Sequence, residues 1–202
     1  MPNTRPSARA ASRTSSAPAK SASSRKWLRE LTQSAPPDRS PAGATPLKFS
    51  LWTLFGFLVL SLDQATKFWF ERAFDPGDIH PVLPGFNLVL AHNYGAAFSF
   101  LAEMGGWQRW VLSAFALVVV FVVLRMLWRH NARFLFSLSL TLIGAGALGN
   151  LCDRMTSGYV IDFLDFYWRN WHWPAFNVAD IAICMGAAGI VIDEFRHVNK
   201  EK

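Results

Sequence analysis

Four long apolar segments constrain this chain more than any other feature of its sequence. A helix needs about 20 apolar residues to cross a hydrocarbon core about 30 Å thick, and each segment is close to that length. The four segments are Phe49–Phe70, Trp107–Trp128, Phe134–Cys152 and Pro174–Ile192. Because backbone groups inside a bilayer must be satisfied within the segment, we expect all four to be helices that span a membrane.

The composition points the same way. Hydrophobic residues make up 51% of the chain and charged residues 17%, whereas charged residues make up roughly a quarter of soluble domains. This argues against a soluble enzyme. The first 48 residues carry nine Lys or Arg and two acids and so contribute +7, whereas the rest of the chain contributes −1 to the net charge of +6. The basic character of the chain is therefore no evidence for a nucleic-acid partner, and we expect none.

The charge distribution also divides the chain. Residues 1–47 are rich in Pro, Ser and Arg and poor in large apolar groups, so we expect a disordered basic cytoplasmic extension. Residues 48–196 would form one four-helix transmembrane domain, and residues 197–202 a cytoplasmic tail. No short apolar run with a cleavage site precedes Phe49, which argues against a secretory signal peptide.

The basic residues predict the orientation of the helices. Lys and Arg gather in the extension, in the connection between the second and third segments, and in the tail, and such loops stay in the cytoplasm. Both termini are therefore expected in the cytoplasm and residues 71–106 and 153–173 outside. The first of these loops alternates Gly and Pro with β-prone residues, which predicts a small sheet or hairpin at the outer interface. The second is rich in aromatic residues, which favour the headgroup level.

Ionisable residues in apolar segments are costly, so each needs a partner or a role. Asp63 and Lys67 are spaced i, i+4, which predicts an ion pair on one helix face. Asp180 would lie about 9 Å along the fourth helix from Pro174, near its outer end. Asp162 follows an apolar, strand-like stretch in the second outer loop.

Two further acids, Asp153 and Asp165, are expected to be solvated loop residues. Cys152 and Cys184 lack the spacing of a zinc or redox site.

Asp162 and Asp180 suggest chemistry because two carboxylates held close in a desolvated site share one proton. One could activate water while the other protonates a carbonyl oxygen. The same residues also fit a proton or ion relay in a small transporter, or a structural acid network. A transporter would place its acids near the bilayer midplane and commonly shows internal repeats, and this sequence has none.

Five short motifs then occur in a fixed order. They are DQATK at 63–67, NYGAAFS at 93–99, GNLCDR at 149–154, GYVIDF at 158–163 and FNVAD at 176–180. In this order, across the four segments, they closely resemble the bacterial lipoprotein signal peptidases (signal peptidase II). The resemblance covers about residues 49–195 and leaves out the basic extension.

This resemblance implies an all-α membrane protein with four transmembrane helices, a small extracytoplasmic β-cradle and an interfacial helix. It implies a multi-pass enzyme of the cytoplasmic (inner) membrane, with its active site at the outer face. The implied activity is that of an aspartyl endopeptidase without metal or cofactor, which removes the signal peptide from diacylglyceryl-modified prolipoproteins by cleaving before the lipidated Cys. The expected partners are these substrates and membrane lipids, with no nucleic acid, and the expected state is a monomer.

The resemblance also assigns roles to residues of this chain. Asp162 and Asp180 match the catalytic pair, and Asp63 and Lys67 match an ion pair of the first helix. The positions that line the site, and that hold the substrate or the acids, are Asn93, Asn150, Arg154 and Asn177.

Overall fold

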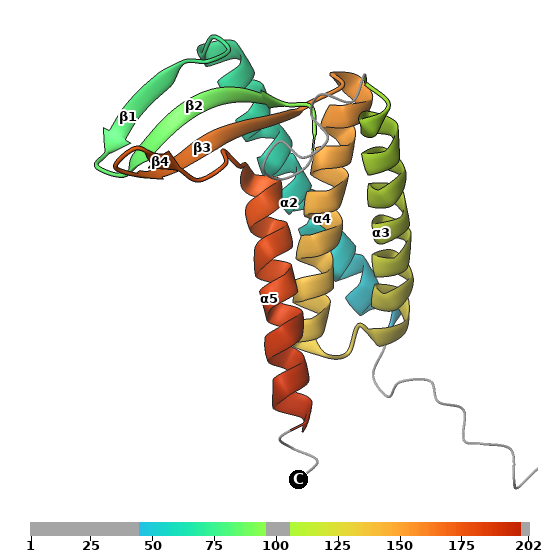
Figure 1. Cartoon of the computed structure of the whole chain (residues 1–202). Coiled ribbons are helices and arrows are strands. Elements are labelled where there is room, and N and C mark those ends of the chain that lie inside the picture. Colours follow the sequence, from blue (N-terminus) through green and yellow to red (C-terminus); the bar gives the residue numbers. More distant parts are fainter. Residues whose placement is uncertain (1–44, 96–105, 199–202) are drawn as a thin grey trace, which may run out of the picture. The chain divides into compact units, whose positions relative to one another are not determined.

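A computed structural model describes residues 45–95 and 106–198, all within one unit, Ser40–Lys202. The helices of this unit lie side by side, and a small sheet lies at one end of them (Figure 1). The helices are α2 (Pro46–Ala73), α3 (Gln108–His130), α4 (Phe134–Thr156) and α5 (Val178–Val198). Most of the predicted extension and tail, residues 1–47 and 197–202, lies outside the described residues.

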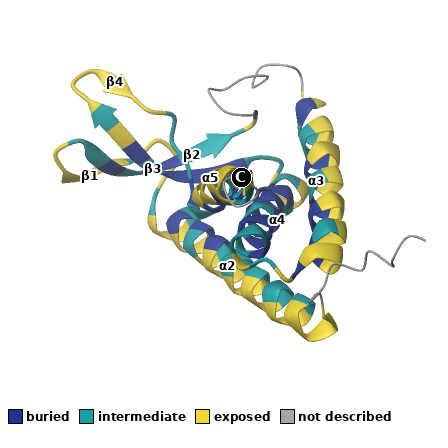
Figure 2. Cartoon of the chain, turned by 90° about the horizontal axis from the view of Figure 1, so that it is seen from below, coloured by how far each residue is buried: buried dark blue, intermediate teal, exposed yellow. Residues whose placement is uncertain are grey.

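Helix α4 is the centre of the bundle and packs against α2, α3 and α5. Figure 2 shows it largely buried between the three others, whose outward faces are exposed. Helix α2 buries Asp63 and Lys67, while most of its large apolar side chains, such as Leu58 and Phe68, stay more than half exposed. Polar groups inside and apolar groups outside are the distribution that a lipid environment favours.

Within the described residues, the three helices α2, α3 and α4 are long and apolar enough to cross a membrane. Helix α5 is 21 residues long, but it carries Asp180 in its first turn and Arg196 in its last. By length and composition, three of the four predicted spans are therefore supported, and the fourth stays a proposal.

Several helix boundaries differ from the sequence-based expectation by one to six residues, and two of the differences concern the acidic residues. Helix α4 continues beyond Cys152 to Thr156. Helix α5 starts at Val178 instead of Pro174, because Phe176 forms a β-bridge with Leu164 that keeps this stretch extended. The prediction that Asp180 lies about 9 Å along the helix is therefore wrong, since Asp180 lies in the first turn.

The sheet is antiparallel, with strand order β1-β2-β3-β4. Its strands are β1 (Ile79–Leu83), β2 (Phe86–Asn93), β3 (Val160–Trp168) and β4 (Trp171–His172). The turn between β1 and β2 contains Gly85 with φ of 89°, a conformation that glycine adopts without strain. The predicted hairpin is confirmed, and strands of the second connection extend it. The described part of the connections contains no further helix, so the interfacial helix stays a prediction.

An apolar cluster fixes the sheet to the end of α2. The cluster contains Phe70 of α2, Leu90 of β2, and Ile161 and Phe163 of β3, all buried. The rings of Phe70 and Phe163 stack with their centroids 4.2 Å apart. Burial of side chains of this size stabilises a contact by about 1.5–3 kcal/mol each, so the sheet has a defined position on the bundle.

Small residues bring α4 and α5 close together. The buried positions of α5 include Ala182, Gly186 and Gly189. A Cβ atom at Gly186 would lie 2.6 Å from the Ser139 carbonyl oxygen and 2.7 Å from Cγ1 of Ile143. In lipid, where apolar surface gives little driving force between helices, such close backbone contact is a main source of association.

We therefore expect Gly186→Val to lower the free energy of unfolding by about 1–3 kcal/mol, the usual cost of overpacking. Ala187→Val is the matched control, because Ala187 is the next residue and is exposed. The measurement is thermal unfolding in detergent micelles. Equal melting temperatures for the two variants would contradict the close packing of α4 and α5.

Candidate active site

Asp162 and Asp180 face one cavity of about 600 Å³ at the junction of the sheet and the helices. Asp162 comes from β3, opposite Ala91 of β2, and Asp180 comes from the first turn of α5. The cavity is also lined by His92, Asn93, Asn150, Arg154 and by largely apolar residues, among them Phe176, Ile181, Cys184 and Met185.

The carboxyl group of Asp162 is almost fully buried, with 2% of the residue exposed. It accepts hydrogen bonds from Nδ2 of Asn93 at 3.0 Å and from Nδ2 of Asn177 at 2.7 Å. Burial and the nearby charge of Asp180 raise the pKa of Asp162 to about 7, against the lowering effect of the two amide hydrogen bonds. Asp162 therefore holds a proton up to neutral pH.

The start of α5 fixes Asp180. Oδ1 of Asn177 accepts a hydrogen bond from the Asp180 backbone N–H at 3.0 Å, and Oδ2 of Asp180 accepts one from the Asn177 N–H at 3.3 Å. This reciprocal pair is a capping box, which satisfies two free N–H groups of a helix start. The other oxygen, Oδ1 of Asp180, accepts a hydrogen bond from Nδ2 of Asn150 at 2.8 Å.

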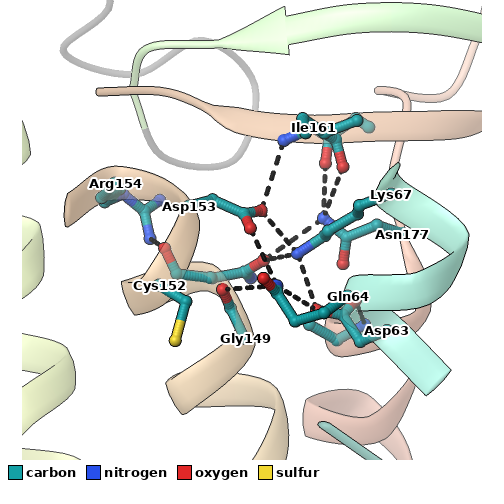
Figure 3. Close-up of polar contacts among 12 residues, drawn as sticks. Asp63, Gln64, Lys67, Gly149, Cys152, Asp153, Arg154, Ile161 and Asn177 are labelled. Carbon is teal, nitrogen blue, oxygen red and sulfur yellow. Dashed lines mark hydrogen bonds and ion pairs between the residues drawn. The ribbon is translucent and has the colours of Figure 1, made fainter. Parts of the chain in front are cut away.

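The buried ammonium group of Lys67 lies between Asp63 of α2 and Asp153 of α4 (Figure 3). Nζ of Lys67 lies 2.9 Å from Oδ2 of Asp63, 2.7 Å from Oδ2 of Asp153 and 3.0 Å from Oδ1 of Asn150. The three N–H groups of the ammonium are thus all used. Lys67 and Asp63 are each only 1% exposed. Asn150 connects this network to Asp180, because its amide nitrogen donates to that carboxylate.

Asp63 and its neighbours tie three helices together. Oδ1 of Asp63 accepts a hydrogen bond from the backbone N–H of Ala179, at the start of α5, at 2.8 Å. Nε2 of Gln64 donates to Oδ1 of Asp153 at 2.9 Å. A Cβ atom at Gly149 would collide with the Asp63 carboxylate, so the glycine gives the carboxylate room between α2 and α4.

Arg154 closes the site on the side of β2. Its Nη2 donates to the carbonyl oxygen of Gly95 at 3.1 Å and its Nη1 to that of Asn150 at 3.3 Å. The structure thus joins all eight residues singled out from the sequence through hydrogen bonds and ion pairs, directly or through neighbours. Such a set can hold one proton between two carboxyl groups, with amide and guanidinium donors close by.

The expectation that Asp153 and Asp165 are solvated is wrong. Asp153 is 4% exposed and pairs with Lys67, because α4 continues past Cys152. Asp165 is 5% exposed and accepts a hydrogen bond from Nδ2 of Asn87 at 2.8 Å. If the third helix is predicted to continue past Cys152, Asn150 and Asp153 lie on one helix face. This spacing is the signal that could have identified Asp153 as a site residue.

Comparison with known proteins identifies relatives of this chain. The family model described as Signal peptidase (SPase) II matches residues 55–196. A protein of Cupriavidus pinatubonensis named "Lipoprotein signal peptidase" is 50% identical over 163 residues, which cover 81% of this chain and 91% of the relative. A protein of Burkholderia mallei with the same name is 50% identical over 147 residues, which cover 73% and 89%.

Two solved structures of bacterial membrane enzymes share the fold. One has a TM-score of 0.68 and 25% sequence identity, covering 76% of this chain and 92% of the other. The second has a TM-score of 0.63 and 26% identity, covering 71% and 92%. The match to the family model and the identity to these relatives together show that this chain belongs to the signal peptidase II family.

Proposed function

We propose that this protein is an aspartyl endopeptidase that removes the signal peptide from diacylglyceryl-modified prolipoproteins, cleaving before the lipidated Cys. The observation that carries the proposal is the pair Asp162 and Asp180 in one largely desolvated cavity, with the pKa of Asp162 raised to about 7. The substrate class is supported by the relatives named lipoprotein signal peptidase.

The pair would act as a general acid and a general base. The ionised carboxylate takes a proton from a water molecule, whose oxygen attacks the carbonyl carbon of the scissile peptide. The protonated partner gives its proton to the carbonyl oxygen, so that a tetrahedral diol forms. When the diol collapses, the C–N bond breaks and the departing amine takes up a proton from the pair.

The neighbouring donors would orient the reacting groups. Asn93 and Asn177 hold the two oxygens of Asp162, and Asn150 holds Asp180. The guanidinium of Arg154 lines the same cavity and is placed to bind a carbonyl group of the substrate backbone. These donors keep the acids at fixed positions while charge develops on the carbonyl oxygen.

The proposal includes an orientation in the inner membrane. All four helices, α5 included, would cross the bilayer, with both termini in the cytoplasm and the cavity at the outer face. The wall formed by Ile181, Cys184 and Met185 of α5 would give apolar surface to the lipid and signal helix of the substrate. We propose that the enzyme acts as a monomer.

The position of the acids favours peptidase over transport chemistry. Asp162 lies on a strand outside the helices, and Asp180 lies in the first turn of α5. A proton or ion relay would place such acids near the middle of the spanning helices. Water and a peptide arriving from the membrane surface can meet at the position observed.

Asp162→Asn and Asp180→Asn should each reduce cleavage at least about a thousandfold, because loss of one member of a catalytic unit disables the whole unit. Glu194→Gln is the matched control, since Glu194 lies exposed at the opposite end of α5. The assay is a gel shift of a diacylglyceryl-prolipoprotein in detergent micelles, with an unlipidated precursor in parallel. Substantial turnover by folded Asp180→Asn would refute the catalytic pair.

The raised pKa of Asp162 predicts the pH dependence. The pair needs one proton, and that proton is lost as pH rises through about 7. We expect kcat/KM to fall about tenfold per pH unit above that value. The measurement is a pH–rate profile with a lipidated precursor. A rate that stays constant to pH values well above 7 would show that the reaction does not need the shared proton.

Lys67→Met should unfold or strongly destabilise the protein, by about 3–5 kcal/mol, because it leaves Asp63 and Asp153 buried without a counter-charge. The double variant Lys67→Met with Asp63→Asn removes one of the stranded charges and should recover part of the loss. Thermal unfolding in micelles measures both. Wild-type stability of the single variant would contradict a structural role of the ammonium group.

A further inference from the structure

Glu71 of α2 connects the helix to both strands that carry the site. It lies one turn beyond Lys67 on the same helix face. Its Oε1 accepts a hydrogen bond from the hydroxyl of Tyr159 at 2.9 Å, and its Oε2 lies 3.2 Å from Nε2 of His92. The exposed fraction of the side chain is 33% for Glu71 and 18% for His92, so solvent screens this contact only in part.

Aromatic contacts hold the two partners of Glu71 together. The rings of His92 and Tyr159 stack with centroids 4.0 Å apart, and Tyr94 meets Tyr159 edge-on at 5.4 Å. Burial and the hydrogen bond to Glu71 raise the pKa of Tyr159 to about 12, so the phenol stays a donor over the working pH range. We refer to Glu71, His92 and Tyr159 as the Glu71 cluster.

Two members of the Glu71 cluster are next to the active site in the sequence. His92 directly precedes Asn93, and Tyr159 directly precedes β3. In the sheet, His92 is opposite Ile161, and Asn93 is opposite Val160. Asp162 lies two residues further along β3 than Val160, and its Oδ2 accepts the hydrogen bond from Nδ2 of Asn93. A displacement of His92 from Tyr159 would therefore move Asn93 away from the acid.

We propose that the Glu71 cluster is a positioning device that holds the Asn93 amide on Asp162. The inference rests on the proposed peptidase function and adds residues outside the pair and its direct partners. His92 lies at the wall of the cavity, but its ring contacts Glu71 and Tyr159, so we assign all three as positioning residues. Glu71 is the central member, because one carboxylate joins α2, β2 and the segment before β3.

This role has a consequence that a purely structural role lacks. The hydrogen bond from Asn93 lowers the pKa of Asp162, so loosening Asn93 should raise it further. The charged groups that face Asp162 from the other elements are Lys67 of α2 and Asp180 of α5, with Arg154 of α4 lining the same cavity, and none of them is altered. His92 is faced by Glu71 and Tyr159, which are themselves the members tested.

The test compares pH–rate profiles of the full-length enzyme on a diacylglyceryl-prolipoprotein. His92→Phe keeps a ring for stacking but loses the bond to Glu71, and Glu71→Leu loses both bonds. We expect kcat to fall about threefold to tenfold and the alkaline limb to move up by about 0.5–1 pH unit, the worth of one hydrogen bond. Glu71→Gln keeps a hydrogen-bond acceptor and a donor at this position. Compared with Glu71→Leu, it should bring both kcat and the alkaline limb most of the way back to the wild-type values.

His80→Phe and Tyr167→Phe are the matched controls. His80 of β1 has a side chain that is 58% exposed, with Nε2 3.7 Å from Oδ2 of Asp78, and Tyr167 stacks on His172 of β4. Neither contacts Asn93 or the acids in the described structure, and both should keep the wild-type limb. Tyr159→Phe, which removes only a hydroxyl, is the mildest probe if another variant does not fold.

The Asp162 carboxyl group is also titrated by carbon NMR, which does not depend on cleavage. A higher pKa in His92→Phe and Glu71→Leu than in the wild type and controls supports the positioning role. Identical titration in folded variants overturns it. If the wild type itself leaves the lipidated precursor intact, the proposed function fails, while the titration still decides the role of the Glu71 cluster.

Discussion

The buried ammonium group of Lys67 is the interaction on which the bundle and the site depend together. A charge removed from water costs several kcal/mol unless close partners compensate for it. Lys67 has three, and they come from α2 and α4. Two of these partners also form a hydrogen bond to α5. Asp63 accepts one from the backbone N–H of Ala179, and Asn150 donates one to Asp180. Satisfying one charge thus sets the start of α5 and the orientation of a carboxylate.

The acids lie where the environment changes from helix bundle to sheet. Asp162 is on a strand fixed by the cluster around Phe70 and Phe163, and Asp180 is in a helix start fixed by Asn177. Burial at this junction raises the pKa of Asp162, yet the junction also borders a cavity of about 600 Å³. Peptide hydrolysis beside a membrane needs both conditions.

Much of the fold was predictable, because apolar length and the spacing of Asp63 and Lys67 are local signals. A long apolar segment indicates a membrane helix, and Gly and Pro mark the hairpin. Helix ends are less local. Helix α5 begins at Val178 because Phe176 pairs with Leu164, and α4 extends to Thr156 with Asp153 facing Lys67. Both depend on partners distant in the chain.

The sequence by itself determined the apolar helices, their order, and which polar residues had to find partners, since a hydrocarbon core penalises every unpaired charge. The ordered motifs also identified the family. Only the tertiary structure decided that Asp162 and Asp180 share one cavity, that Asp153 is buried, and that Glu71 joins His92 to Tyr159. These contacts join residues far apart in the chain, so they exist only after β3 has paired with β2 and α5 has packed on α4.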